Sequence, residues 1–285
     1  MKFKAIINKF AKENKIAAQA VLQTYMLERF LERISLSNYK NNFILKGGML
    51  ISSIIGIDSR TTMDMDTTIK GFKLNKENIL NIMSEICDIK IDDNVSFKVT
   101  KIEEIRDDDE YGGFRVSFES FYNSNMPVIL KIDITTGDKI TYKEEYYEFK
   151  LMFEERKIQV LSYNIETIIA EKFESILKRG PLSTRIRDYY DVYILLHTQK
   201  QNINKNVLKD AIKNTFKYRK SIKLLDEFEE IIELLKFNEN MIKQWKRYQK
   251  NNFFAEDIIY EDLISSIYDV YNMIKYINGK IKLPV

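Results

Sequence analysis

Residues 43–72 have the sequence FILKGGMLISSIIGIDSRTTMDMDTTIKGF, and this stretch decides the fold. An apolar run ends in two glycines, and Asp64 and Asp66 follow an Arg-Thr-Thr loop. The residues after the loop alternate between apolar and polar, which is typical of a β-strand. Because residues i and i+2 of a strand point to the same face, the two aspartates should project together. Met63 and Met65 should point the other way, into the core.

The spacing of the aspartates indicates a metal site, because two carboxylates this close repel each other and a divalent cation relieves the repulsion. Oxygen-only ligands favour Mg²⁺ or Mn²⁺, whose remaining positions take water and substrate phosphates. A second alternating strand, VILKIDITTG, places Asp133 on one of its faces. If the two strands are neighbours, three carboxylates converge, and such a group can hold two metal ions for nucleotidyl transfer. We therefore predict metal ligands at Asp64, Asp66 and Asp133, although an Asp-x-Asp pair also occurs by chance at exposed strand ends.

The two glycines indicate a phosphate-binding turn. Gly47 and Gly48 let the backbone come close to a phosphate with its amides directed at it, and the N-terminus of a following helix adds partial positive charge. Lys46 stands beside them. A Gly-Gly pair is also a common turn, but the succession of a phosphate turn, paired acids and a third acid on another strand predicts a triphosphate site.

A second group of charged residues lies on two predicted helices. The apolar residues of 165–179 recur at helical spacing, and Lys172 falls on the same stripe. A lysine there must contact an anion, bridge to a core carboxylate or extend to water. Asp188 and Asp191 share a face of the next helix, where acids can also serve only to complement the helix dipole. A single pocket that contains Lys172, Asp188 and Asp191 accounts for all three charged residues.

The composition limits the other classes of site. The chain has 285 residues, a net charge of +3, one cysteine, Cys87, and one histidine, His197. The single cysteine excludes an intramolecular disulfide and a multi-cysteine zinc site, and the single histidine leaves little room for a histidine-based metal site or triad. No apolar run is long enough to span a membrane and the N-terminus has no secretory signal, so we expect a cytoplasmic protein that has no membrane partner.

Basic residues gather locally, although the small net charge does not by itself indicate a nucleic-acid partner. Three stretches are rich in them: Lys178, Arg179, Arg185 and Arg187; Lys209, Lys213, Lys217, Arg219, Lys220 and Lys223; and Lys243, Lys246, Arg247 and Lys250. Such basic stretches are commonly solvent-exposed faces that bind no nucleic acid. Phe216 and Trp245, which lie among them, are commonly core residues rather than platforms on which bases stack.

The chain divides into two predicted domains of different class. Residues 1–160 combine a helix over 3–35 with a mixed sheet of four or five strands, and a strand pair or extended connection covers 139–160. Residues 161–285 have helical patterns, which begin after the N-cap Asn164. The expected fold class is α+β, with an N-terminal mixed-sheet domain and a C-terminal helical domain that completes an active-site cleft.

These residues together resemble a known family. The chain contains LKGGML, then RTTMDMD, the later strand aspartate, and AEKFESILKRGPLSTRIRDYYD. The first two resemble the opening motif of the nucleotidyltransferase-fold superfamily. The whole set, over residues 40–200, resembles the AbiEii/AbiGii toxin family, which includes the MenT toxins.

The resemblance implies a bacterial toxin that is paired with a cognate antitoxin and takes part in phage defence by abortive infection. Characterised relatives transfer NMP from an NTP to the 3′ end of tRNA and so block translation, which implies Mg²⁺ or Mn²⁺ and an NTP as co-substrate. By position, the catalytic residues would be Asp64, Asp66, Lys172 and Asp188, and the nucleotide-binding residues would be Lys46, Gly47, Gly48, Arg60, Lys172 and Asp191. The superfamily often has Ser or Thr in the glycine turn, where this chain has Met49.

Two other functions remain open from the sequence. The same site would serve for NMP transfer to a protein hydroxyl, and a non-catalytic protein would bind NTP or RNA without turnover. The retention of the acids and of Lys172 argues against binding alone, because binding rarely needs a metal cluster.

Overall fold

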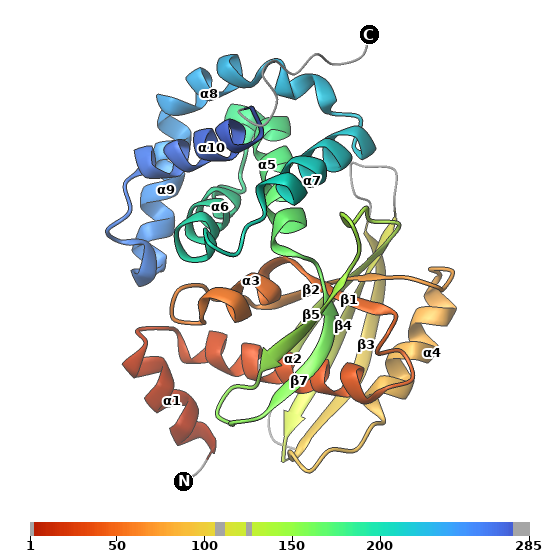
Figure 1. The fold of residues 1–285 in the computed structure, drawn as a ribbon. Coiled ribbons are helices and arrows are strands. Elements are labelled where there is room, and N and C mark those ends of the chain that lie inside the picture. The colour runs from red at the N-terminus through yellow and green to blue at the C-terminus, as the bar shows by residue number, and fades with distance from the viewer. Residues whose placement is uncertain (1–2, 106–111, 124–126, 276–285) are drawn as a thin grey trace. The chain divides into compact units, whose positions relative to one another are not determined.

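The computed structural model describes residues 3–105, 112–123 and 127–275 (Figure 1). The chain forms two compact units, one of residues 1–138 and 144–163 and the other of residues 139–143 and 164–285. We refer to them as the sheet unit and the helical unit. Within the described residues, no helix combines the length and the apolar character needed to cross a membrane.

The described part of the sheet unit contains one mixed sheet of seven strands, in the order β3-β4-β5-β2-β1-β7-β6. The strands are β1 (Phe43–Lys46), β2 (Asp64–Ile69), β3 (Val95–Ile105), β4 (Gly113–Tyr122), β5 (Val128–Thr136), β6 (Glu145–Lys150) and β7 (Lys157–Ser162). Strand β2 runs antiparallel to β1 and parallel to β5, so the strand with the two aspartates lies in the interior of the sheet. This arrangement confirms the expected mixed sheet.

The sheet is larger than the four or five strands expected from the sequence. Strand β1 has only four residues, the first three of them buried, so it lacks the alternation that reveals a half-buried strand. It pairs in parallel with β7, which brings the β6–β7 hairpin onto the sheet. For residues 139–160 we expected either a strand pair or an extended connection, and the hairpin confirms the strand pair.

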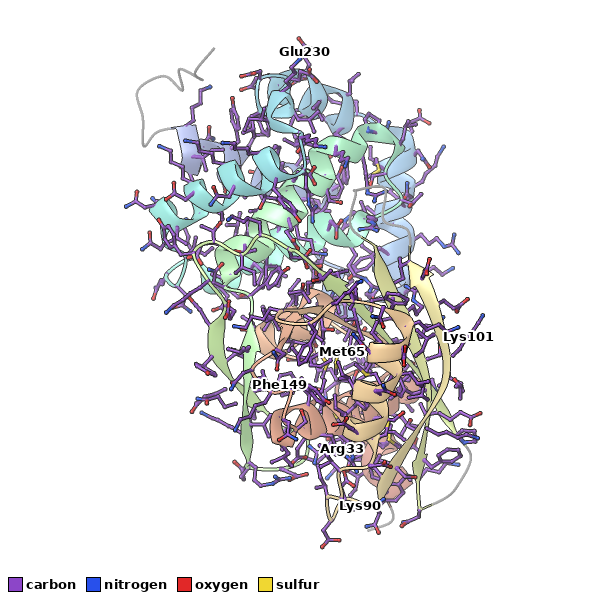
Figure 2. All side chains as sticks on the ribbon, turned by 90° about the vertical axis from the view of Figure 1, so that its right-hand side faces the viewer. Arg33, Met65, Lys90, Lys101, Phe149 and Glu230 are labelled. Atoms are coloured by element: carbon purple, nitrogen blue, oxygen red, sulfur yellow. The ribbon has the colours of Figure 1, made fainter. Side chains whose placement is uncertain are left out.

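Four helices accompany the sheet in the described residues: α1 (Phe3–Glu13), α2 (Ala18–Leu36), α3 (Gly47–Ile55) and α4 (Lys76–Cys87). Helix α2 lies across one face of the sheet (Figure 1). The ring of Phe30 packs against Phe97 and Phe118, with centroids 5.2 and 4.8 Å apart. Met65 is fully buried in this interior, whereas Lys101 on the edge strand β3 extends outward (Figure 2). The expectation for Met63 was wrong: it precedes β2 and is 51% exposed.

The single helix expected over residues 3–35 is also wrong, because the chain turns between α1 and α2. Lys15 has a φ of 53°. The amide of Ile16 donates to the carbonyl of Ala11, and the side chain of Asn14 donates to that of Phe10, both at 2.9 Å. These bonds end α1 without a glycine, so the usual stop signal is missing from the sequence.

In the helical unit, helix α5 starts, as expected, after the N-cap Asn164, whose side chain accepts a hydrogen bond from the amide of Thr167 at 2.8 Å. Its α-helices are α5 (Ile165–Arg179), α6 (Ile186–Gln199), α7 (Lys205–Tyr218), α8 (Phe228–Lys236), α9 (Glu239–Asn251) and α10 (Tyr260–Lys275). In the described residues, three short 3₁₀ helices lie among them: η1 (Gly180–Leu182), η2 (Ile222–Leu225) and η3 (Phe253–Ala255). The fold class is therefore α+β, as the sequence predicts.

Candidate functional site

Charged residues form a row across four neighbouring strands of the sheet. Asp66 on β2 lies opposite Asp133 on β5 and opposite Lys46 on β1, and Asp133 lies opposite Arg115 on β4. Cross-strand partners point to the same face of a sheet. Their alternation with buried residues such as Met65 places them on the face opposite α2. We call this surface the carboxylate face.

Asp64 also lies on the carboxylate face, two residues from Asp66 and opposite Lys131. Asp64 is an exposed residue, but the hydration that its carboxyl loses to partial burial raises its pKa. The negative charges of Asp66 and Asp133 raise that pKa further, while Arg115 and Lys131 oppose them. The face therefore has an excess of negative charge at the position where the sequence predicts a metal.

The glycine turn is fitted to Asp66 and Arg60. Gly47 has a φ of +64°, and a Cβ added there would lie 2.8 Å from the Cβ of Asp66. The amide of Gly48 donates to Oδ2 of Asp66 at 3.4 Å, and its carbonyl accepts from Nη1 of Arg60 at 2.8 Å. Arg60 is buried, and a Cβ on Gly48 would lie 2.6 Å from that same nitrogen. The structure thus brings four predicted site residues together at the N-terminus of α3.

Lys46 has a partner that sequence reasoning missed. Its ammonium forms an ion pair with the carboxylate of Asp138 and donates to Oγ1 of Thr135 at 2.8 Å. The hydroxyl of Tyr163 donates to the same carboxylate at 2.8 Å. Burial acts to raise the pKa of the Asp138 carboxyl, but Lys46 and these hydroxyls outweigh it and hold the pKa below its usual value. Asp138 lies in a turn sequence with no recognisable motif, so no sequence signal pointed to it.

Asp133 also has an unforeseen partner. Nε of Arg115 donates to Oδ1 at 2.8 Å and Nη2 donates to Oδ2 at 2.7 Å, so both oxygens of Asp133 are engaged. The strand register sets this contact, and the register cannot be derived from the β4 sequence alone. Among the described residues, no group of three or more His, Cys, Asp or Glu side chains is arranged to hold a metal ion.

The helical unit brings together Lys172, Asp188 and Asp191. The ammonium of Lys172 lies 2.5 Å from Oδ1 of Asp188 and 3.1 Å from Oδ2 of Asp191. Ser175 donates to the other oxygen of Asp188 at 3.1 Å. The side chain of Asp191 has no exposed surface, whereas that of Lys172 is 20% exposed. Helix α5 therefore presents a lysine whose charge is held by two acids of α6 and whose side chain still reaches solvent.

The basic stretches differ in their exposure and in their ion pairs. Lys178, Arg185 and Arg187 are exposed around the end of α5 and the start of α6. Arg219, by contrast, forms ion pairs with Glu174 and Glu171 at 2.8 and 3.2 Å. Phe216 and Trp245 are buried. They are therefore core residues, as is common for such side chains, rather than platforms on which bases stack.

The family model described as "Nucleotidyl transferase AbiEii toxin, Type IV TA system" matches residues 29–266 of this chain. The chain belongs to this AbiEii family. It is therefore a nucleotidyltransferase toxin of a type IV toxin–antitoxin system, and the family implies an NTP substrate and an antitoxin partner. No curated protein matches the sequence.

Solved structures share the fold of this AbiEii chain at low sequence identity. The MenT4 nucleotidyltransferase toxin from Mycobacterium tuberculosis is 13% identical, with a TM-score of 0.59 over 96% of this chain and 99% of that one. JHP933 from Helicobacter pylori is 15% identical, with a TM-score of 0.51 over 93% and 94% of the two chains. A putative nucleotidyltransferase from H. pylori is 13% identical, with a TM-score of 0.51 over 92% and 99%. The recognition of the family and of a nucleotidyltransferase fold from the sequence is confirmed.

Proposed function

We propose that this AbiEii toxin transfers NMP from an NTP to the 3′ end of tRNA in a Mg²⁺-dependent reaction and so blocks translation. The observation that supports it most directly is the paired Asp64 and Asp66 beside the glycine turn, in a chain of a nucleotidyltransferase family. In the reaction, an acceptor hydroxyl attacks the α-phosphorus of the NTP. The bond from that phosphorus to the bridging oxygen breaks, and pyrophosphate leaves.

The carboxylate face fits a divalent cation. Asp64 and Asp66 provide oxygen ligands only, on one face of one strand, and their mutual repulsion favours a cation between them. These two residues would hold Mg²⁺ or Mn²⁺. When bound, the ion would supply neutralisation of phosphate charge in the transition state.

The glycine turn and Lys46 would bind the triphosphate. The backbone at Gly47 and Gly48 opens helix α3, whose N-terminus favours an anion. Lys46 would add a positive charge, and the buried Arg60 would hold the turn in position through the Gly48 carbonyl. Neither glycine has a side chain of its own, so a phosphate can come close to the backbone of this turn.

Lys172 would stabilise the negative charge that develops on the departing pyrophosphate. Asp188 and Asp191 would keep its ammonium charged and directed, because each lies within ion-pair distance of it. Asp188 would be the further essential acid. The domain over 161–285, in this view, takes part in the same reaction as the domain over 1–160.

The choice of tRNA as acceptor is supported by the exposed Lys178, Arg185 and Arg187, since phosphate backbones are bound mainly by such cations. A toxin that acts on tRNA would act in the cytoplasm, and it would contribute to phage defence by abortive infection. Transfer to a protein hydroxyl would use the same chemistry, so the acceptor needs its own test.

The test is incubation of the purified protein with Mg²⁺, each α-³²P-labelled NTP in turn and total bacterial tRNA, followed by a denaturing gel. We expect one nucleotide to label a tRNA band, and Asp64→Ala and EDTA each to abolish the label. A label that resists RNase but not protease would assign a protein acceptor instead. The proposal fails if no labelled product forms, or if Asp64→Ala protein labels tRNA as well as the parent does.

A further inference from the structure

The contact between Arg115 and Asp133 bears on how many metal ions the carboxylate face can bind. Three carboxylates on one face would ordinarily suggest a pair of divalent ions. We propose that the Arg115 guanidinium takes the place of the second ion, so that this face binds one metal ion, through Asp64 and Asp66. The inference rests on the proposed function, because it concerns the metal site of that reaction.

The geometry of the pair engages the whole carboxylate group. Two parallel hydrogen bonds of 2.8 and 2.7 Å join the guanidinium to both oxygens of Asp133. Such two-pronged, charge-assisted pairs are among the stronger polar contacts in proteins. A divalent ion placed on the same oxygens would have to lie close to the positive charge of Arg115, which opposes its binding.

The backbone fixes the pair in place. Arg115 and Asp133 are direct partners in the antiparallel β4–β5 ladder. Val116 and Ile132, the next residues of that ladder, have no exposed surface because they face the core. A slip of one residue would turn these apolar side chains to the solvent face, so the register is strongly specified. Arg115 is thus a built-in partner of Asp133.

One ion is also enough for the two carboxylates that Arg115 does not engage. Asp64 and Asp66 together match one divalent cation, and Asp133 is matched by Arg115. The absence, among the described residues, of any group of three acids, histidines or cysteines arranged for a metal agrees with this division. Lys131 lies on the same face and is exposed. Its direct partners in the strand ladders are Asp64 and Ser117, so it is not a ladder partner of Asp133.

The test is to count bound Mn²⁺ on the purified full chain by electron paramagnetic resonance. We expect one Mn²⁺ per chain for the parent, two for Arg115→Met, and one again for Arg115→Met/Asp133→Asn. Lys131→Met is the matched control, because it removes one positive charge from the same face without touching Asp133. It should leave the count at one.

Two outcomes would overturn the inference: a count of two in the parent, or a count that stays at one in folded Arg115→Met. Asp133→Asn gives an independent measure if Arg115→Met fails to fold. It should leave the parent's single ion in place, and loss of a bound ion would contradict the inference.

Asp64→Asn/Asp66→Asn distinguishes failure of this inference from failure of the proposed function. If Mn²⁺ binding survives that change, the metal assignment of the proposed function fails as well; if binding is lost, a negative Arg115 result concerns Arg115 alone.

Discussion

Asp138 shows how much of the site depends on a single residue outside every motif. It is mostly buried, with 16% of its side chain exposed, and it holds the ammonium of Lys46, which is 14% exposed. Thr135 and Tyr163 donate to the same carboxylate oxygen of Asp138. The carboxylate therefore compensates a buried cation and orients it at the start of the glycine turn.

We predict that Asp138→Asn lowers the free energy of unfolding by about 1–3 kcal/mol, because it removes the carboxylate charge that pairs with the largely buried ammonium of Lys46. Urea denaturation followed by circular dichroism measures this loss. Glu148→Gln is a suitable control, since Glu148 pairs with Lys157 on the same unit but their side chains are 70% and 56% exposed. An exposed pair of this kind contributes about 0–1 kcal/mol. Equal losses for the two variants would contradict the prediction.

Lys172 offers a second test at the residue scale. We predict that Lys172→Met lowers the stability of the chain, because the fully buried carboxylate of Asp191 would lose its ion pair with Lys172. Adding Asp191→Asn should restore part of the loss, with a coupling energy of about 0.5–3 kcal/mol in a double-mutant cycle. Lys178→Met, an exposed change on the same helix, should alter stability by no more than about 0.5 kcal/mol. Additive losses in the cycle would show that the two residues do not interact.

At the scale of elements, the junction between β1 and α3 combines two demands on Gly47. Its φ of +64° disfavours any residue with a Cβ, and such a Cβ would also collide with Asp66. Gly180, after α5, has a φ of +49° but open space around its own Cβ position. Substitution of Gly180 therefore tests backbone strain alone, whereas substitution of Gly47 tests backbone strain together with displacement of the Asp66 carboxylate.

We predict that Gly180→Ala costs about 1–3 kcal/mol of stability, because its φ of 49° and ψ of −141° lie outside the regions that a residue with a Cβ readily adopts. Gly47→Ala should cost more than this and should also reduce NMP transfer, because Asp66 must move. Urea denaturation and the labelling assay measure the two effects. Equal stability losses with unchanged transfer by Gly47→Ala would mean that the glycine does not make room for Asp66.

The elements also show which parts of the fold can be predicted from the sequence. Period-two alternation suffices to place Asp64 and Asp66 on one face of a strand, and Asn164 is a sufficient signal for the start of α5. The four residues of β1 are too few and too buried to reveal a strand. The contact of Arg115 with Asp133 depends on pairing between strands, which no local pattern specifies. The site was thus predictable where it rests on local periodicity and was missed where it rests on register.

At the scale of the whole molecule, helix α2 buries a network of charges that should control how stability varies with pH. Arg29 is fully buried and lies within 3.0 Å of Glu28 and Glu32 and 2.7 Å from Glu154. The amide of Met152 donates to Glu28 at 2.7 Å. Burial raises the pKa of the Glu28 carboxyl from 4.5 to about 7, although Arg29 and this amide oppose the change.

A carboxyl with a raised pKa binds a proton in the folded chain that the unfolded chain has already released. We therefore predict that the contribution of Glu28 to stability falls as the pH rises from 4.5 to 7. Urea denaturation of the parent and of Glu28→Gln at several pH values measures it, since the variant cannot titrate there. The parent should lose stability relative to the variant across this window. A difference that is constant, or that changes in the opposite direction, would contradict the assignment.

The peptide of residues 139–143 makes both units discontinuous along the chain. Within the helical unit, Thr141 is buried, its amide donates to Thr167 at 3.2 Å, and its hydroxyl accepts from Asn214 at 2.9 Å. A fragment that starts at Asn164 would lack both of these hydrogen bonds. Anyone who wishes to produce the helical half by itself would therefore need a rearranged gene, in which this short peptide is joined by a linker ahead of Asn164.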